Sequence, residues 1–181
     1  MSRPVALTGT PGTGKSRVAA TLSARYRVVE VADLARAWGV ARPLGRGVEV
    51  DLERLISAFR RRAGRLPYEL VVGHLAHLLP VRDVVVLRCH PEKLARRLRA
   101  ARRGSAEDRR ANYVAEALDL VLAEAVRPRR TVWEVDTSGR SVAHVARAVA
   151  ERVRQRGPSD YGRVDWLADP RVTAHLLDRS P

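Results

Sequence analysis

The sequence contains almost no lysine, cysteine or methionine. Its only lysines are Lys15 and Lys93, and its single cysteine, Cys89, excludes an internal disulfide and fits a reducing compartment. No apolar run is long enough to cross a bilayer, and the chain enters a strand pattern without the layout of a signal peptide. We therefore expect a cytoplasmic protein, with no membrane partner, whose 181 residues bury a sizeable core.

The net charge of +14 comes almost entirely from arginine. One explanation is compositional bias, since Asn, Gln, Met and Cys are also scarce, as in proteins from hot habitats. The other is a polyanionic partner, either a nucleotide or RNA. Composition does not choose between the two. Lys15 is more informative, because a compact ammonium kept in an arginine-rich chain indicates a position where a planar guanidinium would not fit.

The stretch VALTGTPGTGKS at residues 5–16 matches the phosphate-binding P-loop, G-x-x-x-x-G-K-[ST], between a predicted strand and a predicted helix. Its glycines, which include Gly12 and Gly14, let backbone N–H groups turn towards phosphate oxygens at the start of the helix. Lys15 is expected to reach the β- and γ-phosphates of ATP. Ser16 offers a hydroxyl to Mg²⁺, and Arg17 adds a cation beside the ATP site.

Strands alternate with helices along the whole chain. We expect strands at 5–8, 27–31, 68–72, 83–88 and 131–137, and helices at 17–26, 33–39, 51–63, 91–103, 106–126 and 141–157. The stretch 40–49 is interpreted as a Gly/Pro/Arg loop. Continuous apolar strands indicate burial on both faces, so the pattern predicts an α/β, three-layer P-loop NTPase fold with a parallel five-stranded sheet.

The acceptor of a phosphoryl group would have to bind beyond the P-loop. Asp33 and Arg36 follow the second predicted strand, and an arginine there can form a bidentate pair with a mononucleotide phosphate. The segment 96–110 carries seven arginines interrupted by Gly104 and Ser105, which suits a short basic lid. For most of these arginines a solvated helix face is the preferred explanation, but Arg103 or a close neighbour is a candidate phosphate contact.

The order of segments resembles the adenylate kinase isoenzyme 6 family, small nucleoside monophosphate kinases of archaea and eukaryotes. The resemblance covers most of the chain and rests on these segments: TGTPGTGK, ADLAR, VEVDLERL, GHLAHLLP, VVVLRCHPEKL, EALDLVLAEA, DTSGRS and GRVDWL. It implies an adenylate-kinase-like core over residues 1–157, with a mononucleotide-binding segment near 30–52 and a short lid near 103–113. A tail, 158–181, would pack on the core or extend from it.

The resemblance also implies chemistry. ATP and AMP would be the substrates with Mg²⁺, Lys15, His74 and Arg103 would be catalytic, and Asp33 with Arg36 would bind AMP. ATPase activity, contact with a small-subunit ribosomal protein (uS11 in that family) and a role in small ribosomal subunit maturation near rRNA are implied as well. The DTSGRS turn would lie near the adenine, or else form a helix start capped by Ser138 or Ser141.

The chain departs from the family pattern at Val72. The family carries an acidic residue two positions before a histidine at the end of the third strand, and here Val72 precedes Gly73 and His74. Ser16, the phosphates and a water-linked Asp33 could still hold Mg²⁺, which needs few protein ligands. His74 either orients the attacking water or the acceptor, or caps the strand by satisfying a backbone carbonyl.

Two functions are compatible with these residues. The first is an adenylate kinase reaction, ATP + AMP ⇌ 2 ADP, with the breadth of monophosphate acceptors left open. The second is an ATP-driven ribosome assembly factor with little kinase activity, which binds a ribosomal protein or rRNA. A metabolite kinase of the shikimate type shares the P-loop, but ADLAR at residues 32–36 suits a mononucleotide better. The tail's Trp166, Leu176 and Leu177 are expected to strap it onto the core.

Overall fold

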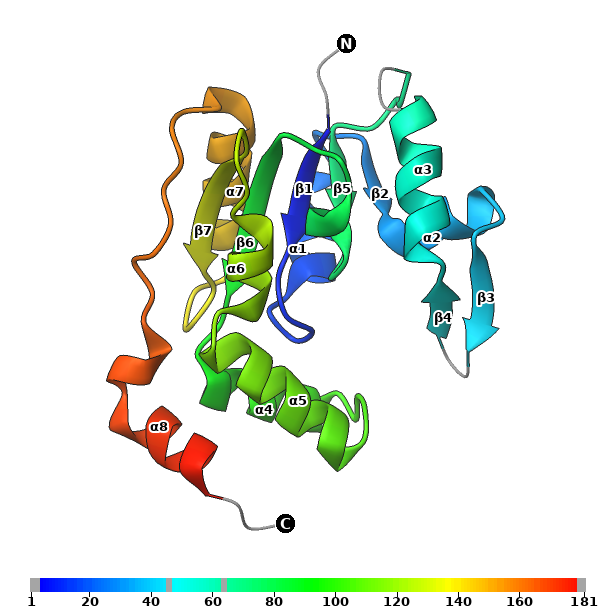
Figure 1. The fold of residues 1–181 in the computed structure, drawn as a ribbon. Coiled ribbons are helices and arrows are strands. Elements are labelled where there is room, and N and C mark those ends of the chain that lie inside the picture. The colour runs from blue at the N-terminus through cyan, green and yellow to red at the C-terminus, as the bar shows by residue number, and fades with distance from the viewer. Residues whose placement is uncertain (1–3, 45–46, 63–64, 179–181) are drawn as a thin grey trace.

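The computed structural model describes residues 4–44, 47–62 and 65–178. Five parallel strands form the central sheet in the order β2-β5-β1-β6-β7 (Figure 1). Their bounds are β1 Val5–Thr8, β2 Val28–Glu30, β5 Leu70–Val72, β6 Asp83–Arg88 and β7 Thr131–Asp136. The expected α/β architecture with a parallel five-stranded sheet is confirmed.

Helices cover both faces of the sheet and one of its ends. They are α1 Lys15–Leu22, α2 Val31–Ala37, α3 Leu52–Arg62, α4 Pro91–Ala100, α5 Ala106–Ala117, α6 Leu120–Ala125 and α7 Val142–Gln155, with a 3-10 turn, η1, at Ala76–Leu78. Helices α1 and α7 pack on one face, and α2, α3 and α6 on the other. The pair α4 and α5 lies beyond the carboxyl ends of the strands (Figure 1). None of the helices in the described ranges has the length and apolar character needed to cross a membrane.

The strands are apolar on both faces, which is why helices can cover the sheet twice. Along β1, Val5 and Leu7 pack with α1 and α7, whereas Ala6 packs on the opposite side, and all three are fully buried. Successive side chains of a strand point to opposite faces, so a continuous apolar run serves two cores at once. This arrangement leaves the carboxyl edge of the sheet as the place where polar residues collect.

The expected continuous helix over 106–126 is wrong in one place. The helix breaks at Asp119, whose φ of 56° lies in the left-handed region, and α6 begins one residue later. Asp119 forms an ion pair with the buried guanidinium of Arg88 on β6. Aspartate tolerates the left-handed region better than most residues, so this tertiary contact interrupts a helix that periodicity alone would continue.

The stretch interpreted as a loop, 40–49, contains a hairpin instead. Strand β3, Ala41–Leu44, pairs antiparallel with β4, Gly47–Val50. Ala41 and Val50 face each other across the ladder and pack against the core cluster of α2 and α3. These contacts with α2 and α3 are tertiary, so the local Gly/Pro/Arg composition did not reveal them.

The tail packs along the edge of the sheet and then across helices α4 and α5. Asp160 forms a parallel bridge with Trp133, which extends the sheet beyond β7. A 3-10 turn, η2 Trp166–Ala168, and α8 Pro170–Leu177 follow. Val172 is fully buried beside Tyr113.

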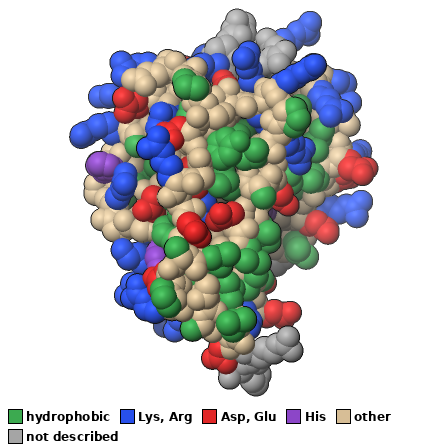
Figure 2. Space-filling model, turned by 60° about the vertical axis from the view of Figure 1, so that its left-hand side comes forward, with side chains coloured by type: hydrophobic (Ala, Val, Ile, Leu, Met, Phe, Trp, Pro, Cys, Tyr) green, Lys and Arg blue, Asp and Glu red, His purple; other side chains and the backbone are tan. Residues whose placement is uncertain are grey.

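The expectation of a strap therefore holds for Trp166 and Leu176, which pack against this cluster of α4, α5 and α8 residues. For Leu177 it is wrong, because the side chain points outwards and is 80% exposed. Figure 2 shows the molecule turned by 60° from the view of Figure 1. Several hydrophobic side chains lie at the surface in the lower half of this view, whereas Lys and Arg are spread over its upper part and its rim and do not form one patch.

Candidate nucleotide-binding site

The P-loop joins β1 to α1, and its glycines allow the backbone conformation of the loop. Gly9, Gly12 and Gly14 have φ values of 140°, 96° and 100°, a region that side chains rarely allow. A Cβ on Gly9 would lie 2.3 Å from the Leu87 carbonyl oxygen of β6. Lys15 starts α1, and its Nζ donates to the carbonyl oxygens of Gly9 at 2.6 Å and Thr10 at 3.0 Å.

The ammonium of Lys15 is in an unfavourable setting. Burial lowers its pKa to about 8, although Glu116 and Glu30 oppose the shift by attraction. Arg103 on the far side of the pocket lowers it further by repulsion. The charged form thus lacks the negative charge that would stabilise it, which bound phosphate groups supply.

A pocket of about 590 Å³ opens in front of the loop. It lies at the carboxyl ends of β1, β2, β5 and β7, where ligands bind in open parallel sheets. Its lining comes from the P-loop and the start of α1, from the ends of strands, from the second half of α4 and the elbow after it, and from the start of α7. These residues are Pro11–Val18, Glu30, Gly73, His74, Arg97, Leu98, Ala100, Ala101, Arg103, Thr137, Arg140, Val142 and Val145. Five cationic side chains from four segments converge on this space.

The elbow that carries Arg103 is built by local signals in the sequence. Helix α4 ends at Ala100, and Gly104 takes a φ of 69°. Ser105 then caps α5 with a capping box: its Oγ accepts from the Asp108 N–H at 3.0 Å, and Asp108 Oδ2 accepts from the Ser105 N–H at 2.7 Å. The interruption expected at Gly104 and Ser105 is confirmed, and it leaves Arg103 exposed at the mouth of the pocket.

The turn after β7 forms another part of the wall. Arg97 donates to the Thr137 hydroxyl and to its carbonyl oxygen, each at 3.2 Å, which ties α4 to this turn. Ser141 caps α7 by accepting from the His144 N–H at 3.2 Å, as one of the two expected alternatives has it. Because Thr137 and Arg140 also line the pocket, the turn both starts a helix and borders the site.

Comparison with known proteins places this chain among relatives. A family model described as an AAA domain matches residues 5–119. Curated archaeal proteins named "Putative adenylate kinase" align with nearly the whole chain: that of Thermococcus onnurineus is 35% identical over 96% of this chain and 97% of its own length. The proteins of Archaeoglobus fulgidus (40%, covering 91% and 92%) and Halobacterium salinarum (40%, covering 90% and 96%) are similarly close. The chain belongs to this archaeal family.

Solved structures with the same fold are more distant in sequence. A gluconokinase from Sinorhizobium meliloti has a TM-score of 0.51 at 17% identity, covering 85% of this chain and 93% of its own. A shikimate kinase from Bacteroides thetaiotaomicron has a TM-score of 0.51 at 13% identity, covering 84% and 98%. At these identities the likeness concerns the fold alone.

Seven of the nine residues predicted for the site lie together in the pocket. They are Gly12, Gly14, Lys15, Ser16, Arg17, His74 and Arg103. Asp33 and Arg36 on α2 stand outside its lining and form an exposed ion pair at 2.7 Å. The sequence placed Asp33 and Arg36 correctly after the second strand. In the structure, however, the two side chains pair with each other and do not line the pocket.

The two histidines after β5 have different surroundings. His74 lines the pocket and remains accessible to solvent; its pKa is lowered mainly by partial desolvation of the ring and also by the nearby Lys15. His77 is buried between Thr8 Oγ1, 2.9 Å from its Nδ1, and Glu124 Oε2, 2.8 Å from its Nε2. A carboxylate only accepts, so Nε2 carries the proton and Nδ1 accepts from Thr8. His77 is thus a structural link between β1 and α6.

Two carboxylates near the site were not singled out from the sequence. Glu30, at the end of β2, lines the pocket together with Ser16; burial is the main cause of its raised pKa, and the Ser16 side chain opposes the rise. Glu116 on α5 is buried behind the P-loop and accepts from Thr10, Arg88 and the Cys89 N–H. Glu30 could have been noticed as the one acidic residue of the predicted strand 27–31.

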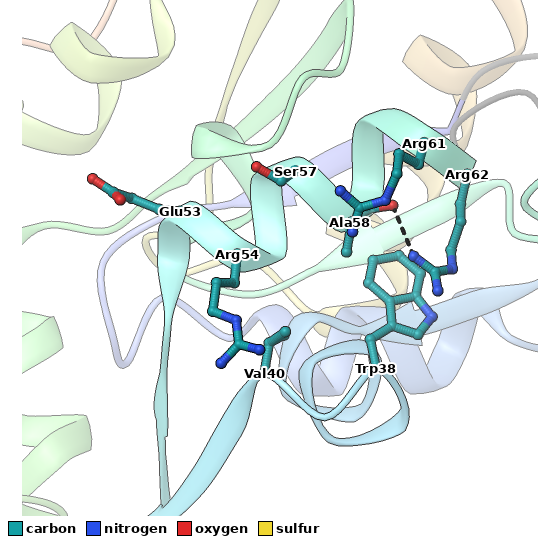
Figure 3. Close-up of a pocket in the computed structure, with 8 residues that line it drawn as sticks. All are labelled: Trp38, Val40, Glu53, Arg54, Ser57, Ala58, Arg61 and Arg62. Atoms are coloured by element: carbon teal, nitrogen blue, oxygen red, sulfur yellow. Dashed lines mark hydrogen bonds between the residues drawn. The ribbon is translucent and has the colours of Figure 1, made fainter.

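A second pocket, of about 400 Å³, lies away from the P-loop on the outer side of α3. Figure 3 shows Arg54, Arg61 and Arg62 extending from α3 around Trp38 and Val40. The Arg62 guanidinium lies 5.1 Å from the centre of the Trp38 ring and donates to the Ala58 carbonyl oxygen at 3.3 Å. The pocket is thus basic, with an aromatic wall.

Proposed function

We propose that the protein is a nucleoside monophosphate kinase that transfers the γ-phosphoryl group of Mg·ATP to AMP, so that ATP + AMP ⇌ 2 ADP. The observation that carries the proposal is the convergence of Lys15, Arg17, Arg97, Arg103 and Arg140 on one pocket in front of a P-loop. Phosphoryl transfer depends mainly on positioning and on neutralising charge, which such a constellation supplies. The names of the archaeal relatives point to the same reaction.

Each pocket residue has a proposed role that follows from its position. The N–H groups of Gly12 and Gly14 and the Lys15 ammonium face the β- and γ-phosphates, after Lys15 leaves the carbonyl oxygens it now contacts. Arg103 at the lid elbow meets the transferred group when the lid closes and excludes water. Bound Mg²⁺ would neutralise phosphate charge, and the Ser16 hydroxyl with a nearby carboxylate is a fitting oxygen donor set.

The acceptor side rests on α2. Arg36 would exchange its Asp33 partner for the AMP phosphate, which offers a bidentate acceptor of higher charge. His74, exposed at the end of β5 and neutral near pH 7 because its pKa is lowered, would orient the attacking oxygen or a water. The same placement supports a slower ATPase reaction in which water replaces AMP.

The test is production of ADP from Mg·ATP with and without AMP. We expect stoichiometric conversion of AMP, no turnover by Lys15→Ala, and a fall in kcat of about 10²-fold or more for Arg103→Ala. Arg36→Ala should mainly raise the KM for AMP. Arg25→Ala, at an exposed position outside the pocket lining, is the matched arginine control. Hydrolysis that does not respond to AMP would overturn the kinase proposal and leave an ATPase.

A second proposed role is assembly of the small ribosomal subunit, carried by the pocket in Figure 3. Trp38 offers a stacking surface for a base, and Arg54 and Arg61 offer guanidinium groups for phosphates. A net charge of +14 favours rRNA over a basic ribosomal protein such as uS11. Binding of single-stranded RNA that weakens steeply with salt, and weakens again in Arg54→Glu/Arg61→Glu, would support this role. Unchanged binding by that variant would refute it.

A further inference from the structure

The register between β2 and β5 places two residues side by side at the edge of the nucleotide pocket. The strands are parallel, and Val28 pairs with Leu70, Val29 with Val71, and Glu30 with Val72. Paired residues of neighbouring strands point to the same face of a sheet.

The burial pattern identifies that face. Val28 and Leu70 pack in the core cluster of α1 and α7, and Val29 and Val71 pack in the opposite cluster. By alternation, Glu30 and Val72 both face α1, the helix whose first turn carries Lys15 and Ser16. Val72 is fully buried in the α1 cluster, whereas Glu30 stands at the pocket wall.

P-loop enzymes hold Mg²⁺ with the Ser or Thr of the loop and an acidic residue at a strand end nearby. In this protein strand β5, which lies between β1 and β2, ends in the apolar Val72, and this side chain offers the ion no oxygen. The carboxylate that lines the pocket together with Ser16 is that of Glu30, one strand further out. Neighbouring strands lie ~4.8 Å apart, so a side chain that acts from β2 has further to reach, and glutamate is one methylene longer than aspartate.

We propose that Glu30 has taken the place of the missing acid of β5 and holds the magnesium ion of Mg·ATP together with the Ser16 hydroxyl. The inference rests on the proposed nucleotide kinase function. It assigns the metal-holding carboxylate to β2 and makes the water-linked Asp33 unnecessary. Glu30, after Glu116, also attracts the Lys15 ammonium before nucleotide binds, without offsetting the effect of burial.

The decisive variant is Glu30→Gln, which keeps the length of the side chain and its ability to bond Ser16 but removes the charge. The first measurement is the affinity for ATP by calorimetry with and without Mg²⁺. We expect the variant to bind magnesium-free ATP at least as tightly as the unchanged protein, and to gain little from Mg²⁺. The second is the Mn²⁺ affinity of the ATP complex by electron paramagnetic resonance, expected to fall about 10- to 100-fold.

A merely structural role for Glu30 predicts a different result. If the residue only fixes Ser16, both affinities for ATP change together and the Mn²⁺ affinity of the ATP complex stays the same, which would overturn the inference. Glu151→Gln, at an exposed glutamate of α7, is the matched control and should leave both measurements unchanged. Asp33→Asn tests the rival carboxylate, and a selective loss of Mn²⁺ affinity there but not in Glu30→Gln would also refute the proposal.

Moving the carboxylate from β2 to the paired position on β5 gives an independent test. Glu30→Gln combined with Val72→Asp moves the acid to the paired position, and we expect it to restore the response of ATP binding to Mg²⁺. Circular dichroism checks that the buried aspartate leaves the fold intact; the single Glu30→Gln result decides the matter if it does not. If the protein without substitutions binds no ATP, the proposed function itself is refuted. If it is a Mg²⁺-dependent kinase and Glu30→Gln changes neither its ATP binding nor its Mn²⁺ affinity, only this inference is refuted.

Discussion

The Glu116 carboxylate accepts a hydrogen bond from the Thr10 hydroxyl at 2.5 Å, although the two residues stand 106 positions apart in the chain. The same carboxylate accepts from Arg88 Nε at 2.9 Å and from Trp166 Nε1 at 3.2 Å. One buried group therefore joins the P-loop, strand β6, helix α5 and the tail. The geometry of the nucleotide site depends on this junction as much as on the P-loop motif.

Removing this carboxylate should destabilise the protein strongly. Glu116→Ala removes one ion-pair partner of the buried Arg88. Removing one partner of a buried ion pair costs about 3–5 kcal/mol. The contacts of Arg88 with Asp119 and Glu134 remain, so we expect the lower end of that range. Urea denaturation measures the loss, with the exposed Glu107→Ala as control. Equal stability of the two variants would contradict a central role for the junction.

The turn at Gly9 should not accept a side chain. In Gly9→Ala the new Cβ would meet the Leu87 carbonyl oxygen at 2.3 Å, at a φ of 140°. We expect a loss of more than about 1–2 kcal/mol of stability, together with loss of ATP binding. Gly157→Ala has no atom within 4 Å of its Cβ and no positive φ, so it should be neutral. Thermal denaturation and ATP titration of both variants check this, and normal ATP affinity in Gly9→Ala would be inconsistent with the loop geometry.

Acid should weaken the fold through His77. Burial lowers the pKa of His77 below 6.5 despite the attraction of Glu124, so the folded state holds this proton less tightly than the unfolded state. Below about pH 6.5 the unfolded state binds more protons, and the free energy of unfolding falls as pH falls towards the folded pKa.

Comparing stability curves isolates this contribution. Unfolding measured between pH 8 and about pH 5 should decline less steeply in His77→Gln than in the unchanged protein, although the variant is less stable at pH 8. His144→Gln, at an exposed site on α7, serves as control for the loss of a histidine. Parallel curves for His77→Gln and the unchanged protein would disprove the assignment.

The tail should contribute to stability through Trp166. Its indole packs on His90, with ring centres 5.1 Å apart, and donates to Glu116. Because the side chain is only partly buried, we expect Trp166→Ala to cost about 1–3 kcal/mol, less than for a core tryptophan. Leu177→Ala, on the exposed side of α8, should change nothing measurable. Chemical denaturation tests the pair, and a loss in Leu177→Ala matching that in Trp166→Ala would argue against the packing described.

Local patterns were sufficient wherever the physics is local. Continuous apolar runs predicted the buried parallel strands, and the P-loop motif located Lys15 and Ser16 at the start of α1. The Gly104-Ser105 pair indicated the elbow of the lid, because its glycine turn and capping box act within four residues. The helix break at Asp119 could not be predicted in this way, since it depends on Arg88, 31 residues away in the chain. The β3–β4 hairpin packs against α2 and α3, and its Gly/Pro/Arg composition does not encode that packing.

By itself, the sequence determined the α/β class, the phosphate-binding loop and the surplus of positive charge, because these follow from residue type and short spacing. Only the tertiary structure decided which side chains meet. Strand order and register set Glu30 beside Val72, and the packing of α5 brought Glu116 behind Thr10. Pairing between strands and helix docking join residues by distance in space, and no pattern within one segment encodes that distance.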